Sequence, residues 1–135
     1  KVWDKLLVKV SHRIKECLRE GDTLARIGGD EFIAVTTDLE NIEDSEDVIK
    51  RLLKAAADPF TIGGYVIHVS ASIGFTLYPQ DDVDAGQLIR HADQAMYIAK
   101  QNGKNRYHLF DTAKDNEIKT QWQSIGDIRI ALNRR

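Results

Sequence analysis

The sequence predicts an α+β domain in which helices pack on a mixed β-sheet. Three segments carry apolar residues at steps of three and four, which is the periodicity of an amphipathic helix. Short apolar runs rich in β-branched residues lie between these segments and indicate strands. A chain that alternates helices with pairs of strands prefers a sheet covered by helices. Its 135 residues are enough for one domain with a substantial core.

Each expected element follows from a local pattern. The helices should end at Gly21, at Asp58-Pro59 and near Asn102-Gly103, where the chain carries residues that stop a helix. Glycine pairs separate the strands of two predicted hairpins, and the first pair of strands is apolar enough for burial on both faces. In chain order we expect a helix at 3–20, strands at 23–27 and 32–37, a helix at 48–56, strands at 60–62 and 65–77, a helix at 88–99 and a strand at 106–110.

The last part of the chain, residues 112–135, predicts a further helix. Its apolar residues fall at helical spacing: Ile118, Trp122, Ile125, Ile128 and Leu132. Two interpretations are open. The helix either folds back on the domain, or connects it to a following domain or a partner helix.

Composition limits the class of protein. The formal net charge of −2 argues against a bulk nucleic-acid binder, so we expect no DNA binding. No apolar run is long enough to cross a bilayer.

The single cysteine, Cys17, cannot form an internal disulfide and lies on a helical apolar stripe, which fits a reducing compartment and a core position. The chain starts at Lys1 and its one methionine is Met96, so we expect a piece of a longer protein.

The most informative stretch runs from Arg26 to Phe32 and places Gly28-Gly29 and two carboxylates between the strands of the first hairpin. Glycine adopts positive φ without steric cost, so the pair suits a tight turn. Asp30 and Glu31 then lie at its tip, where a hard cation such as Mg²⁺ could collect oxygen ligands together with phosphates. The alternative is an ordinary hairpin with two solvated acids.

This turn, Gly28-Gly29-Asp30-Glu31-Phe32, resembles the signature loop of the GGDEF family, the diguanylate cyclases. Members condense two GTP molecules into cyclic di-GMP and release pyrophosphate. The resemblance covers roughly residues 1–110 and implies the ferredoxin-like core of nucleotide cyclases. It also implies that the first strand, which lies in the middle of that sheet, is absent here, so that inner strand edges would be exposed.

The resemblance implies roles for several residues. Asp30 would bind the catalytic metal, Mg²⁺ or Mn²⁺, and Glu31 would support it, while Arg26 would orient the loop or a phosphate. The segment from Ala92 to Arg106 resembles the family's AD-x-A-[LM]-Y-x-AK-x-x-G-[RK]-N-R motif, in which Lys100 and Lys104 meet the terminal phosphates of GTP. On the residues alone, the favoured interpretation of these lysines is a solvated helix end that offsets the helix dipole.

Two weaker matches to the family concern residues that would bind the guanine base of GTP and the product, cyclic di-GMP. Asp4, ahead of a Leu-Leu pair, resembles the aspartate that reads the base, although the family usually has glycine where this chain has Trp3. Arg19 and Asp22 fit the family's RxxD inhibitory site, which binds cyclic di-GMP. A second arginine often completes that site, and either residue at 50–51 (Lys50 or Arg51) could serve.

The resemblance also implies the architecture of the parent. The run 124–135 resembles the linker that enters an EAL phosphodiesterase domain, so we expect an incomplete GGDEF domain at 1–111 and a helical linker at 112–135. The family's first metal-binding aspartate precedes the stretch that matches Lys1. We therefore expect the chain alone to lack cyclase activity. For the parent protein we expect a cytoplasmic location, with or without a membrane anchor in segments outside this chain, and activity as a homodimer. The alternative is a catalytically silent domain that senses GTP or cyclic di-GMP in a GGDEF–EAL phosphodiesterase.

Overall fold

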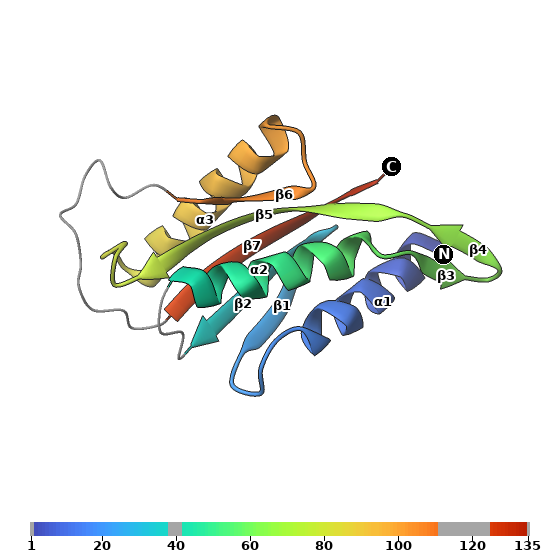
Figure 1. The fold of residues 1–135 in the computed structure, drawn as a ribbon, viewed down its shortest axis with the longest axis horizontal. Coiled ribbons are helices and arrows are strands. Elements are labelled where there is room, and N and C mark those ends of the chain that lie inside the picture. Colours follow the sequence, from blue (N-terminus) through green and yellow to red (C-terminus); the bar gives the residue numbers. More distant parts are fainter. Residues whose placement is uncertain (1, 38–41, 111–124, 135) are drawn as a thin grey trace.

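The structure is a computed structural model that describes residues 2–37, 42–110 and 125–134 (Figure 1). Three helices and seven strands occupy these residues. In chain order they are α1 (Val2–Glu16), β1 (Thr23–Gly28), β2 (Glu31–Thr37), α2 (Ile42–Ala57), β3 (Phe60–Ile62), β4 (Tyr65–Ile67), β5 (Val69–Tyr78), α3 (Ala85–Gln101), β6 (Arg106–Leu109) and β7 (Ile125–Arg134). The predicted mixed α+β fold is confirmed.

Five strands form the main sheet, in the order β1-β2-β7-β5-β6. β5 and β6 are parallel, and the other neighbours are antiparallel, so the sheet is mixed. β3 and β4 form a separate two-stranded hairpin beside α1 (Figure 1). Residues 65–77, predicted as one strand, are thus divided between the small hairpin and the main sheet.

Helices cover both faces of the main sheet. Alternate residues of β5 separate the two sides: Ile73 and Phe75 lie in the core with α1 and α2, whereas Gly74 faces α3. A Cβ atom on Gly74 would lie 2.0 Å from the backbone N of Met96 and 2.2 Å from the backbone O of Ala92. Only glycine therefore allows α3 to approach β5 this closely.

The core lies mainly between the sheet and the pair α1 and α2. Its largest fully buried side chains come from both layers: Phe32, Phe60, Phe75, Leu6, Ile14, Ile49, Leu52, Ile73 and Ile130. In β2 buried and half-buried residues alternate, as expected for a strand with one face in the core. The prediction that both strands of the first hairpin are buried on both faces is wrong, because β1 is an edge strand in which only Leu24 is half-buried.

The largest correction concerns the end of the chain. Residues 125–134 are a strand and not the predicted helix, and β7 lies in the middle of the main sheet between β2 and β5. Its buried Ile128, Ile130 and Leu132 alternate with Arg129 and Ala131, a period of two that the helical reading overlooked. The inner strand edges that we expected to be exposed are thus paired. The rest of the predicted linker, 112–124, lies outside the described residues.

Within the part of the chain that the structure describes, no helix combines the length and apolar character needed to cross a bilayer.

Candidate functional site

The turn between β1 and β2 is built by its two glycines. Gly28 has a φ of 145° and Gly29 a φ of 51°, both in the region that L side chains rarely adopt. A bulge at Ile27 lets Gly28 pair with Glu31 across the hairpin. Arg26 fastens the turn, because its Nε donates a hydrogen bond to the carbonyl oxygen of Gly29 at 2.9 Å. The turn therefore has the tight form that the sequence predicted.

The two carboxylates of the turn differ in their surroundings. Asp30 is half-buried, its backbone carbonyl accepts a hydrogen bond from the N–H of Leu132 at 3.2 Å, and its carboxylate has no hydrogen-bond or ion-pair partner within the described residues. Glu31 is paired: Nη2 of Arg129 lies 3.0 Å from its Oε1. The same guanidinium nitrogen lies 3.6 Å from Oδ1 of Asp93 in α3. β7 thus places a cation between two acidic side chains at this site.

Sequence reasoning missed both partners in this cluster. Asp93 stands inside the predicted α3 motif but was given no role, and Arg129 stood in the segment interpreted as a linker helix. Glu31 and Arg129 project to the same side of neighbouring strands, since Ile33 is the residue opposite Arg129 and Glu31 lies two residues from it. The only signal in the sequence was the alternation of isoleucine, arginine and alanine in β7.

The loop after α3 lies at the same end of the sheet as the turn. One row of paired residues crosses the sheet from Glu31 through Ala131 and Ser72 to Arg106. Three interstrand spacings make this row roughly 14 Å long. Lys104 stands two residues before Arg106, and Lys100 lies two turns beyond Asp93 along α3. The topology thus brings the two predicted motifs to one end of the molecule.

The backbone around Lys104 is unusual. Gly103, Lys104 and Asn105 all have positive φ, at 122°, 62° and 48°. The N–H of Lys104 donates to the carbonyl of Ala99 at 3.1 Å, which closes the C-terminal end of α3. Lys104 is exposed and Lys100 is half-buried. Within the described residues neither ammonium group has a hydrogen-bond or ion-pair partner, so both are free to meet an anion.

The side chains of the predicted inhibitory site form hydrogen bonds with backbone groups of the domain. Asp22 accepts hydrogen bonds from the backbone N–H groups of Arg19, at 2.8 Å, and Thr37, at 3.3 Å. The Arg19 guanidinium donates to the carbonyl of Thr37. Of the two candidates for the second arginine position, Arg51 is the one close by, since its Nη2 donates to the carbonyl of Cys17 at 3.1 Å. The predicted pair thus joins the end of α1 to the end of β2.

Asp4 lies apart from the turn. It is exposed in the first turn of α1, on the side of the sheet opposite α3, and no hydrogen bond or ion pair between described residues connects it with Asp30 or Glu31. α1 packs against α2 and β3, and its first turn lies beside β3 and β4 (Figure 1). Within the described residues, nothing therefore joins Asp4 to the signature turn.

The described residues do not by themselves complete a divalent-metal site. Carboxylate oxygen is the right donor for a hard cation, and the free carboxylate of Asp30 fits that role. Glu31 already has a guanidinium as its partner, and the described ranges contain no group of three histidine, cysteine or acidic side chains that could hold a metal ion. The incomplete metal site expected for this chain stays a prediction.

A second polar cluster, distant in sequence from the turn, was also missed. Buried Asp81 accepts a hydrogen bond from the Thr76 hydroxyl at 2.7 Å, and its Oδ2 lies 2.6 Å from Nδ1 of His91. The His91 ring stacks on Phe110 with a centroid distance of 3.9 Å. These contacts join β5, α3 and the end of β6, which indicates a structural role for a histidine to which the sequence assigned none.

Comparisons with known proteins agree with this geometry. A family model described as "Diguanylate cyclase, GGDEF domain" matches residues 1–106. The bifunctional diguanylate cyclase/cyclic di-GMP phosphodiesterase MucR of Pseudomonas aeruginosa is 39% identical over 132 residues, which cover 98% of this chain and 19% of that protein. The chain thus spans about a fifth of that relative.

Two solved structures are similar in fold. The GGDEF domain of TpbB (YfiN) from P. aeruginosa has a TM-score of 0.77 and 33% identity, with 80% of this chain and 63% of that chain covered. An EAL/GGDEF domain protein from M. capsulatus has a TM-score of 0.69 and 40% identity, with 80% and 70% covered.

Fold and signature turn together define a domain of the nucleotide-cyclase-like class, with helices on both faces of a mixed sheet. Because the family model spans most of the chain, the assignment can be narrower. The chain belongs to the GGDEF family of diguanylate cyclase domains.

Proposed function

We propose that this chain is part of a diguanylate cyclase, in which a GGDEF domain condenses two GTP molecules into cyclic di-GMP. The observation that carries the proposal is the β1–β2 turn, in which positive φ at both glycines presents the free carboxylate of Asp30 beside Glu31. The relatives named as diguanylate cyclases support it. The active form would be a homodimer in which each domain brings one GTP to the shared interface.

In this reaction the 3′-hydroxyl of each GTP attacks the α-phosphorus of the other. Two phosphodiester bonds form, two pyrophosphates leave, and each attacking hydroxyl gives up its proton. Negative charge on the phosphate oxygens must be neutralised by groups held in fixed places. Lys100 and Lys104 would take the terminal phosphates, since both ammonium groups are free within the described residues. Asp30 and Glu31 would be the catalytic carboxylates, and Arg26 with its bond to Gly29 would keep the turn in shape.

A divalent cation, Mg²⁺ or Mn²⁺, would supply charge neutralisation when bound. Asp30 would hold it in part, with the remaining ligands coming from outside the described residues. Asp4 would read the guanine base. For this chain alone we expect no cyclase activity, because Glu31 is paired with Arg129 and the donor set is incomplete.

Inhibition of the enzyme by its product, cyclic di-GMP, is the second part of the proposal. Arg19 and Asp22 would bind cyclic di-GMP, and Arg51 would complete the site because it lies beside the end of α1. Arginine can recognise a guanine edge or a phosphate through parallel hydrogen bonds, and aspartate can accept from a guanine N–H. Binding would require the guanidinium of Arg19 to leave the carbonyl of Thr37. Arg19→Ala should abolish cyclic di-GMP binding by the parent, and unchanged affinity would refute this site.

One observation favours a second candidate function. The ion pair between Arg129 and Glu31 places a cation on a signature carboxylate, as expected for a domain that binds a nucleotide without turning it over. Such a domain would be a silent GTP or cyclic di-GMP sensor beside an EAL phosphodiesterase domain. The bifunctional name of MucR fits a composite parent of this kind.

One experiment separates the two functions. The parent protein is incubated with GTP and Mg²⁺, and cyclic di-GMP is measured by chromatography, with Asp30→Ala and Glu31→Ala as variants. Product that disappears in both variants supports the cyclase. Saturable GTP binding without product supports the sensor, and neither binding nor product rejects both functions.

A further inference from the structure

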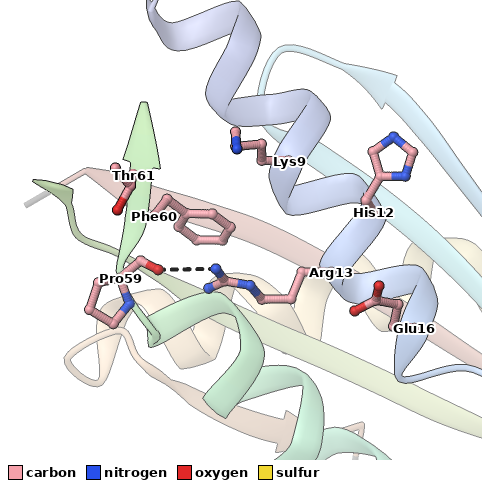
Figure 2. Close-up of a pocket in the computed structure, with 7 residues that line it drawn as sticks. All are labelled: Lys9, His12, Arg13, Glu16, Pro59, Phe60 and Thr61. Carbon is pink, nitrogen blue, oxygen red and sulfur yellow. Dashed lines mark hydrogen bonds between the residues drawn. The ribbon is translucent and has the colours of Figure 1, made fainter. Parts of the chain in front are cut away.

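An open groove runs between α1 and β3, and none of the residues discussed above for nucleotide chemistry lines it, although Asp4 is next to Lys5 in the chain. Two hollows of about 540 Å³ and about 410 Å³ adjoin there, and Lys9 and Thr61 line both. We call this surface the α1–β3 groove. Its lining is Lys5, Val8, Lys9, His12, Arg13 and Glu16 from α1, and Pro59 to Gly63 from the β3 segment. Figure 2 shows the larger hollow, with Lys9 and Arg13 on the side facing Phe60.

The Arg13 side chain, which lines this groove, is held in place by hydrogen bonds and by contact with an aromatic ring. Its guanidinium donates to the carbonyl oxygens of Ala55, Asp58 and Pro59 at 3.0, 2.7 and 3.0 Å. The central carbon of the guanidinium also lies 3.6 Å from the centroid of the Phe60 ring. These contacts use three of the five N–H donors of Arg13 and leave its positive charge at the surface of the groove.

The remaining charged groups make the groove cationic. Lys5 and Lys9 are exposed, and neither has a hydrogen-bond or ion-pair partner within the described residues. Glu16 is the one acidic residue among those that line the two hollows. The local surplus is positive although the whole chain has a formal net charge of −2. Attraction for an anionic partner would therefore be local to this surface.

The edge of β3 adds a directional feature. Gly63 and Gly64, with φ of 56° and 85°, form the two-residue turn of the β3–β4 hairpin, so Ile62 and Tyr65 are a hydrogen-bonded pair. Pairs alternate along an antiparallel ladder, and Thr61 with Val66 is therefore a non-hydrogen-bonded pair. The N–H and C=O of Thr61 thus point away from β4. Within the described residues they have no partner.

We propose that the α1–β3 groove binds an acidic, extended peptide segment of a partner protein. The segment would add a strand to the free edge of β3 at Thr61, and its carboxylates would meet Lys5 and Lys9. Val8, which is 57% exposed, offers an apolar surface for an intervening side chain. A free backbone donor and acceptor side by side match another strand, which favours a peptide over a phosphate or a nucleic acid. With so short an edge the contact is weak and transient.

The test uses a fluorescein-labelled hexapeptide of alternating glutamate and valine, with a lysine–valine peptide of equal length as its counterpart. Fluorescence anisotropy measures the affinity of the 135-residue chain, and ¹⁵N NMR locates the contact. We expect saturable binding of the acidic peptide alone, with amide shifts centred on Thr61 and the exposed side of α1. Absence of binding, equal binding of both peptides, or shifts centred elsewhere would overturn the proposal.

Variants test the charges and the edge separately. The double variant Lys5→Glu/Lys9→Glu should weaken binding about tenfold, because two attractive surface pairs become repulsive. Lys15→Glu is the matched control, since Lys15 is exposed on the same helix but does not line the groove. Thr61→Pro removes the edge N–H and should weaken binding while the NMR spectrum of the main sheet stays unchanged. Equal losses in the double variant and the Lys15 control would refute a specific site.

Discussion

Arg129 of β7 and Glu31 of β2 form an ion pair across neighbouring strands, with 3.0 Å between Nη2 and Oε1. The two residues are 98 positions apart in the chain. The pair connects the signature turn with a strand that lies outside the segment matched by the family model. Through this contact β7 places a guanidinium on one of the two carboxylates of the turn.

The strength of this pair can be measured with a double-mutant cycle. Glu31→Gln, Arg129→Gln and the double variant should give a coupling free energy of about 1 kcal/mol, because the Arg129 side chain is largely buried while Glu31 stays partly solvated. Urea unfolding provides the four free energies. The cycle between Arg129 and Asp93, whose atoms are 3.6 Å apart, should give a smaller value. Coupling near zero in the first cycle would mean that the pair does not stabilise β7.

Gly74 should not tolerate a side chain. A Cβ atom there would overlap the backbone of α3 at Met96 and Ala92, so Gly74→Ala should lower the free energy of unfolding by about 3 kcal/mol. Gly86→Ala is the matched control, because its nearest atom would be Oδ1 of Asp84 at 3.5 Å. Alanine in that helix should leave stability unchanged or raise it by about 0.5 kcal/mol. Similar effects of both substitutions would contradict the close packing of α3 on β5.

Buried Asp81 should be important for stability. Asp81→Ala leaves the Thr76 hydroxyl and Nδ1 of His91 without their partner, which should cost about 2 kcal/mol. Thermal unfolding followed by circular dichroism measures the loss. Asp82→Ala, at the exposed neighbouring position, should change little. If the two variants unfold at the same temperature, the cluster around Asp81 does not hold β5 and α3 together.

Cys17 gives a prediction about pH. Partial burial raises the pKa of the Cys17 thiol, Arg51 lowers it, and Glu16 raises it. Since the folded pKa lies above the unfolded value, the contribution to stability is present below the unfolded pKa and is lost as pH rises through the folded pKa. Alkylation by iodoacetamide should therefore have its pH midpoint above that of N-acetylcysteine.

The neighbouring charges provide the controls for that experiment. Glu16→Gln should move the alkylation midpoint of Cys17 down, and Arg51→Gln should move it up, because each removes one Coulombic contribution of known sign. A midpoint at or below that of N-acetylcysteine would show that burial does not dominate at this thiol.

Local patterns predicted much of the fold. The helices at α1, α2 and α3 and the hairpin around Gly28-Gly29 were expected from apolar periodicity and glycine pairs, and the structure has them. The position of β1 was not predictable from its apolar residues, because burial depends on which strand neighbours it. Its place at the edge leaves one face and one side open to solvent.

For the site, local residues are enough to predict the turn, since only glycine takes the φ of Gly28 and Gly29 without strain, and the acids follow them directly. The segment from Ala92 to Arg106 was likewise recognisable from its residues. Strand pairing in the folded domain, which no local pattern contains, puts residues 125–134 at the centre of the sheet and brings Arg129 to Glu31. The physical reason is that a strand forms where two free edges accept it, and the same apolar spacing can satisfy either a helix or a strand until those edges are known.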